Sequence, residues 1–116
     1  MRNYSFETYR SSDGSLYVDF LFWNLSTDDA DDGLEGWRIY IYSDINYGNK
    51  STSFVDTHRL QSIDESHPYI CWTDEIKTLS DAKSIAALWA DCTALYIKGE
   101  GSFNDVARRL TNGSVK

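Results

Sequence analysis

The sequence predicts an α+β domain. We expect an antiparallel sheet of about five strands within residues 4–72, followed by a long helix over residues 78–98 and a short helix over residues 103–111, both packed on one face of the sheet. Three observations predict this class: side-chain alternation in the first part of the chain, one long amphipathic stretch with marked ends, and a glycine-rich reversal after it. At 116 residues with 41% apolar residues, the chain has the size of one domain, residues 1–116.

The strands are predicted from alternating apolar and polar side chains. The five predicted strands are residues 4–9, 15–23, 37–42, 53–60 and 69–72. The first two form a hairpin, because Asp13-Gly14 supplies the positive φ angles of a tight turn. In the second strand Leu16, Val18 and every even-numbered residue to Phe22 are apolar and share one face. The alternation thus predicts which face of the sheet lies against the core.

Residues 78–98 are predicted to form one helix. Thr78 and Asp81 have the spacing of a capping box, and Gly99 is placed to end the helix in the left-handed conformation. The apolar arc is wider than a helix with one buried side needs, so we expect cover from several sides. A ridge of mostly small residues lies beside the main stripe: Ala86, Ala90, Ala94 and Ile97. Either the helix that follows a second capping box at Ser102 or a second copy of the chain is expected to pack there, and we expect a homodimer.

Charge narrows the classes of partner. The net charge is −7, and twelve acidic against five basic residues lie before residue 68. A polyanion would be repelled, so direct binding of nucleic acid or of an acidic membrane is not expected. No apolar run approaches the roughly 18 residues of a membrane span, and the first residues lack the apolar stretch of a secretory signal. We therefore expect a cytoplasmic protein with its two cysteines, Cys71 and Cys92, as free buried thiols.

An acidic segment follows the second predicted strand. Its carboxylates belong to Asp28, Asp29, Asp31, Asp32 and Glu35. Counted from Asp28 as a calcium loop, Gly33 falls correctly at the sixth position, but Ala30 occupies the third and Ile39 the twelfth, where oxygen ligands are needed. The segment is therefore interpreted as a solvated acidic loop, and whether it binds a cation casually stays open.

Other combinations of residues in the sequence give only weak indications of catalysis or metal binding. The zinc-ligand types are His58, His67, Cys71 and Cys92. Only His67 and Cys71 have close spacing, whereas zinc sites are usually built from tight pairs. The acid-x-Lys pattern of metal-dependent nucleases occurs at residues 75–77 and 81–83, about as often as chance predicts. The sequence thus predicts no catalytic residue, no metal and no cofactor.

The aromatic residues give the main functional prediction. Four of them are expected on the sheet face away from the helices: Tyr17, Trp23, Tyr40 and Tyr42. Exposed aromatic surfaces bind partners. We therefore expect a small non-catalytic binding protein that uses this surface and the acidic loop to bind a basic protein partner. The alternative is a small-molecule-binding protein or minor enzyme with a pocket between sheet and long helix, near Tyr40, Tyr42, Asp56 and His58. A purely structural subunit is a third possibility.

Overall fold

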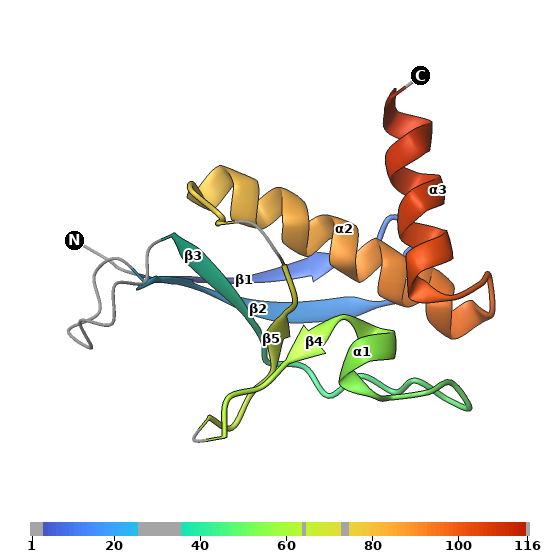
Figure 1. The fold of residues 1–116 in the computed structure, drawn as a ribbon, viewed down its shortest axis with the longest axis horizontal. Helices are drawn as coiled ribbons and strands as arrows, with labels where there is room; N and C mark the ends of the chain where they lie inside the picture. Colours follow the sequence, from blue (N-terminus) through green and yellow to red (C-terminus); the bar gives the residue numbers. More distant parts are fainter. Residues whose placement is uncertain (1–3, 26–35, 64, 73–74, 116) are drawn as a thin grey trace.

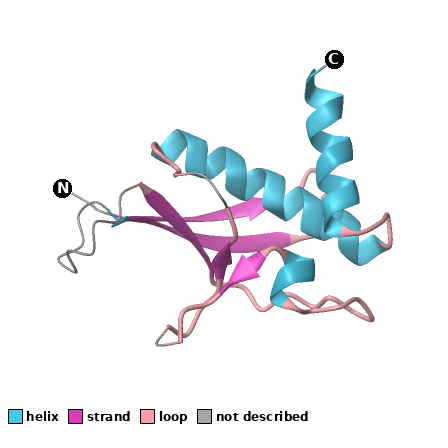
Figure 2. Cartoon of the chain, in the orientation of Figure 1, coloured by secondary structure: helices cyan, strands magenta, loops and turns pink. Residues whose placement is uncertain are grey.

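The computed structural model describes residues 4–25, 36–63, 65–72 and 75–115, with the backbone alone for residues 112–115. A five-stranded antiparallel sheet lies below one long helix, and a second helix rises from the end of the first (Figures 1 and 2). The predicted α+β class is confirmed. The elements are β1 (Tyr4–Arg10), β2 (Tyr17–Asn24), β3 (Trp37–Ile41), α1 (Phe54–Thr57), β4 (Arg59–Leu60), β5 (Tyr69–Ile70), α2 (Leu79–Lys98) and α3 (Phe103–Val115).

The sheet has the order β1-β2-β3-β5-β4, with every neighbouring pair antiparallel. The hairpin of β1 and β2 turns at Gly14, whose φ of 77° suits a residue without a Cβ. β5 lies between β3 and β4, and its Tyr69 is paired with Tyr40 on one side and with Leu60 on the other. Paired residues point to the same face of a sheet, so these three side chains share a face with Leu21, the partner of Tyr40 in β2.

The opposite face of the sheet forms the core with α2. Its central side chains are at most 2% exposed: Val18, Phe20, Phe22, Ile39 and Ile41. Trp89 of α2 is 3% exposed and packs its ring edge-on against Phe20, with the centroids 6.1 Å apart. The predicted inward-facing residues of β2 therefore lie where alternation places them.

Helix α2 begins and ends as predicted. The Thr78 hydroxyl accepts a hydrogen bond from the Asp81 amide at 3.0 Å, and Gly99 ends the helix with a φ of 88°. The alanine ridge is buried within the single chain, because Ala86, Ala90 and Ala94 are 2%, 0% and 2% exposed. Its neighbour Ile97 is half-buried and packs against the core. The ridge therefore offers no surface to a second copy.

Helix α3 packs against the end of α2. Phe103 and Val106 are 6% and 0% exposed, and Phe103 contacts the rings of Trp89 and Tyr96. The predicted capping box is present, since Ser102 Oγ accepts from the Asp105 amide at 3.1 Å. The helix continues to Val115 rather than ending near residue 111.

The predicted strand over residues 53–60 is wrong in its first part. Residues 54–57 form the helical turn α1, because the Ser53 hydroxyl caps it by accepting from the Asp56 amide at 3.1 Å. His58 ends the turn in the left-handed conformation, with φ 53° and ψ 48°. Only Arg59 and Leu60 are extended and pair with β5. The hydroxyl cap explains why alternation is poor in this segment.

Candidate functional site

The sheet face away from α2 is rich in aromatic side chains. We call it the open face, because neither long helix packs on it (Figure 1). Several of its rings are strongly exposed, including Tyr17 at 61% and Tyr42 at 41%. By register, the open face carries Tyr4, Phe6, Tyr17, Leu21, Trp23, Tyr40, Tyr42, Leu60 and Tyr69. All four aromatic residues that the sequence assigns to a binding surface belong to this set.

Neighbouring rings of the open face support one another across the strands. Tyr4 stacks on Trp23 with centroids 5.9 Å apart, and Phe6 meets Tyr42 edge-on at 5.4 Å. Such cross-strand pairs are each worth up to about 1 kcal/mol and restrict the rings to few rotamers. The surface is therefore an ordered array rather than a set of independent side chains.

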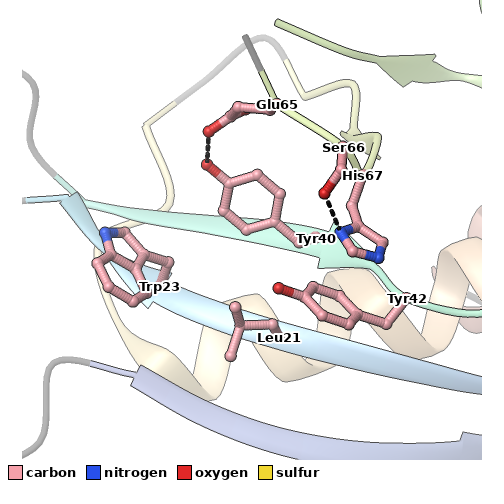
Figure 3. Close-up of a pocket in the computed structure, with 7 residues that line it drawn as sticks. All are labelled: Leu21, Trp23, Tyr40, Tyr42, Glu65, Ser66 and His67. Carbon is pink, nitrogen blue, oxygen red and sulfur yellow. Dashed lines mark hydrogen bonds between the residues drawn. The ribbon is translucent and has the colours of Figure 1, made fainter.

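A recess lies in the middle of the open face. We call it the aromatic hollow; its volume is about 390 Å³. In Figure 3, Leu21 lies between Trp23 and Tyr42, and Tyr40 stands on the side toward Glu65. The complete lining is Leu21, Trp23, Tyr40, Tyr42, Glu65, Ser66 and His67. Strand β2 supplies Leu21 and Trp23, β3 and the residue after it supply Tyr40 and Tyr42, and the connection that leads into β5 supplies the last three residues.

The polar side of the hollow is built around Glu65. The Tyr40 hydroxyl donates to Glu65 Oε2 at 2.7 Å, whereas Glu65 Oε1 is buried without a hydrogen-bond partner among the described residues. Burial, and next the hydrogen bond to Glu65, raise the pKa of Tyr40 to about 12, so this phenol is a neutral donor at neutral pH. Arg38 Nη1 donates to the Tyr40 hydroxyl at 3.5 Å. The guanidinium of Arg38 also lies over the ring of Tyr69, 4.2 Å from the ring centroid.

His67 forms one wall of the hollow. Its ring stacks flat on Tyr42, with centroids 3.8 Å apart and planes 6° from parallel. Its Nδ1 lies 3.0 Å from Ser66 Oγ, a contact between adjacent residues. Serine hydrolases instead orient the imidazole through a carboxylate on its other nitrogen. Here the carboxylate of Glu65 accepts from Tyr40, so it does not orient His67 in that way.

The acidic residues of the predicted binding surface, Asp28, Asp29, Asp31 and Asp32, lie outside the described residues. The two flanking residues are described: the Leu25 amide donates to the Gly36 carbonyl at 2.8 Å. Gly36 has a φ of 88°, and a Cβ there would lie 2.6 Å from the Ile76 carbonyl oxygen. A glycine is therefore required where the chain enters β3, at the Trp23 end of the sheet.

The other sequence candidates lie in separate places. His58, Cys71 and Cys92 line a second cavity beside α2 and α3, whereas His67 lies in the hollow. Within the described ranges, no three His, Cys, Asp or Glu side chains converge as metal ligands would. The residues named for a small-molecule pocket are also divided, because Tyr40 and Tyr42 line the hollow and His58 lines the second cavity. Asp56 is exposed at the surface.

Glu65, Ser66 and His67 are absent from the sequence-based prediction of the site. The sequence indicates only a loop before the last strand. These residues lie over the open face because the strand that follows them pairs with Tyr40. That pairing is long-range and is not readable from local patterns.

Comparison of the chain with protein-family models, curated proteins and solved structures finds no match. In the described part of the chain, no helix has the length and apolar character needed to cross a bilayer. The function is therefore argued from the geometry of the open face.

Proposed function

We propose that this chain is a non-catalytic binding protein that holds a basic protein partner on the open face. A lysine-type ammonium group of the partner enters the aromatic hollow. The observation that carries the proposal is the combination of three aromatic side chains, Trp23, Tyr40 and Tyr42, with the carboxylate of Glu65 in one recess.

The chemistry of the hollow favours a cation on an apolar stem. Aromatic faces attract ammonium groups by roughly 0.5–2 kcal/mol, most strongly where water is excluded. The buried Oε1 of Glu65 lacks a hydrogen-bond partner among the described residues, so a nearby positive charge would offset its cost of burial. Leu21 supplies an apolar contact for the methylene stem of a lysine.

The overall charge supports the same class of partner. A net charge of −7 accelerates encounter with a basic protein and opposes binding of polyanions. In this proposal the acidic segment of residues 28–35 contributes further attraction for a basic partner. A cytoplasmic location and a homodimer stay predictions of the sequence. If a dimer forms, its interface is not the alanine ridge, which is already buried.

The test uses calorimetry to compare two short peptides that are identical except at one position. That position is lysine in one peptide and norleucine in the other. We expect the lysine peptide to bind and the norleucine peptide to bind at least about tenfold more weakly, because only the ammonium group interacts with the rings and Glu65. Glu65→Gln and Trp23→Ala should each weaken the lysine peptide by a similar factor. Tyr17→Ala is the matched control, since Tyr17 belongs to the open face but does not line the hollow. Equal binding of the two peptides, with no effect of Glu65→Gln, would falsify the proposal.

A second comparison isolates the acidic segment. Replacing Asp28, Asp29, Asp31 and Asp32 together with Asn should slow association and reduce its dependence on salt, because exposed charges act at long range and are screened. The preference for lysine over norleucine should persist in this variant. Unchanged association rate and salt dependence would remove the acidic segment from the proposal and leave the hollow.

A further inference from the structure

A second cavity lies on the other side of the sheet, in the wedge between α2 and α3. Figure 1 shows α3 rising from the end of α2 and diverging from it. The cavity has a volume of about 250 Å³. Its apolar wall includes Ile70, Ile85, Leu88, Trp89, Cys92 and Phe103. We call it the apolar cavity.

The base of the wedge is held by defined contacts. Trp89 Nε1 donates to the Thr57 carbonyl at 3.1 Å in a buried position. Phe103 lies against Trp89, with centroids 6.4 Å apart, and stacks on His58 at 4.3 Å. Because these contacts fix where α3 leaves α2, the cavity is a preformed feature of the fold.

The thiols of the cavity act as apolar wall. Cys92 is 0% exposed, and burial, with a smaller contribution from Asp91, raises the pKa of its thiol to about 11. The thiol is therefore protonated at neutral pH and is a weak nucleophile. Cys71 is half-buried on the same wall. Neither thiol therefore requires a polar ligand.

The mouth of the cavity is different, because Arg108 and Thr111 of α3 line it. No carboxylate lines the cavity among the described residues. Arg108 forms an ion pair with Asp105, whose Oδ1 lies 3.6 Å from Nη1, and both side chains are more than 60% exposed. Such exposed pairs are weak, and a guanidinium has five donors, so Arg108 can also bind a second anion.

We infer that the apolar cavity binds a small apolar molecule with one carboxylate. The chain or ring of the ligand lies between α2 and α3, and its carboxylate contacts the guanidinium of Arg108. The Thr111 hydroxyl does not take part, because it donates to the Ala107 carbonyl at 2.9 Å. An apolar cavity of roughly 150 Å³ binds benzene, and pockets for drug-sized molecules begin near roughly 300 Å³. A volume of about 250 Å³ therefore suits one or two rings or a medium-length alkyl chain. This site is separate from the open face and does not rest on the proposed function.

The test uses octanoate and octanol as probes, with calorimetry on the whole chain. We expect octanoate to bind at least tenfold more tightly than octanol. Arg108→Gln should reduce octanoate to the affinity of octanol and leave octanol unchanged. Equal binding of both probes by the unmodified cavity would overturn the assignment of the carboxylate to Arg108.

A cavity-filling change tests the location. Ala107 lines the cavity, so Ala107→Leu should weaken octanoate at least tenfold without lowering the melting temperature. Ala87→Leu on α2 is the matched control, because Ala87 lies outside this cavity and should leave binding unchanged. Octanoate binding that survives Ala107→Leu would place the ligand elsewhere and refute the inference. So would a concentration-dependent dimer that Ala107→Leu dissociates, combined with no octanoate binding, since the wedge would then be an interface between copies.

Discussion

The two faces of the sheet use the same strands for different purposes. In β3, Ile39 and Ile41 are 1% and 2% exposed against α2, whereas Tyr42, which directly follows β3, lies on the opposite face and is 41% exposed. The centre of the covered face consists of aliphatic and phenylalanine side chains, whereas the open face is dominated by tyrosine and tryptophan, with Phe6, Leu21 and Leu60. Tyrosine and tryptophan combine a large apolar contact area with a polar tip, which suits a surface that alternates between water and a partner. Alternation therefore separates two largely apolar faces of different composition, and among the described elements only one of them is covered by a helix.

The largest expected difference between the faces is in stability. Phe20→Ala removes a ring that is 1% exposed and packed on Trp89, so unfolding should become easier by about 3–5 kcal/mol. Tyr17→Ala, on the open face at 61% exposure, should change the free energy of unfolding by no more than about 0.5 kcal/mol. Urea denaturation measures both. Similar losses for the two variants would mean that the open face is covered in solution.

The second prediction concerns the contact between α2 and the rest of the domain. Ala90 is fully buried, so Ala90→Leu should overpack the core and cost about 1–3 kcal/mol. Ala87→Leu on the half-buried side of the same helix should cost less than about 0.5 kcal/mol. Thermal unfolding of the pair is the measurement. If Ala90→Leu is as well tolerated as its control, the alanine ridge is not packed inside the single chain.

Helix α2, which packs on the covered face, is also held to the hairpin of β1 and β2 by ion pairs. The stabilisation that these ion pairs give depends on pH. The hydrogen bond from Lys98, followed by hydrogen bonds from Ser15 and Ser11, holds the pKa of Asp13 well below its ordinary value of 3.8. A carboxyl with a lowered folded-state pKa stabilises the fold above its unfolded pKa, and this stabilisation is lost as the pH falls below about 4.

Asp13→Asn should therefore cost on the order of 1 kcal/mol at pH 7, a value reduced for the solvent exposure of Lys98 and Asp13. The difference between the variant and the original chain should shrink steadily as the pH falls below about 4. Denaturant titrations over this range give the profile. A difference that is constant with pH would show that the Asp13 carboxylate charge is not responsible.

The smallest expected effect is a change in the pKa of Tyr40, on the open face. Burial raises the pKa of Tyr40 to about 12, and the hydrogen bond to Glu65 is the next cause. Glu65→Gln should lower the pKa of Tyr40, because the carboxylate that accepts the phenolic proton is gone, but not to the value of an exposed tyrosine, because burial remains. The ¹³Cζ resonance of labelled tyrosine reports the midpoint. No change in Glu65→Gln would mean that Glu65 does not bond to Tyr40 in solution.

Local patterns predicted the covered face, the open face and α2, because alternation and capping are properties of neighbouring residues. They failed at residues 53–57, where the hydroxyl of Ser53 caps a helical turn that resembles a poor strand in the sequence. The predicted helix over residues 103–111 is present, and the structure extends it to Val115.

Only part of the candidate site is predicted by the sequence, because local patterns describe neighbouring residues alone. Trp23, Tyr40 and Tyr42 follow from alternation within their own strands. Glu65 and His67 reach the hollow only because β5 inserts between β3 and β4, a pairing between distant parts of the chain. The apolar cavity depends on the angle at which α3 leaves α2, which no local pattern specifies.

The most direct test of the account is the position of a bound lysine peptide on the sheet, mapped by amide and aromatic chemical shifts of the isotopically labelled chain. We expect the largest shifts at Leu21, Trp23, Tyr40 and Tyr42, and we expect Glu65→Gln to require about tenfold more peptide for the same shifts while the spectrum stays that of a folded chain. Shifts that gather instead around α2 and α3, or no shifts at millimolar peptide, would contradict the assignment of the open face as the binding surface.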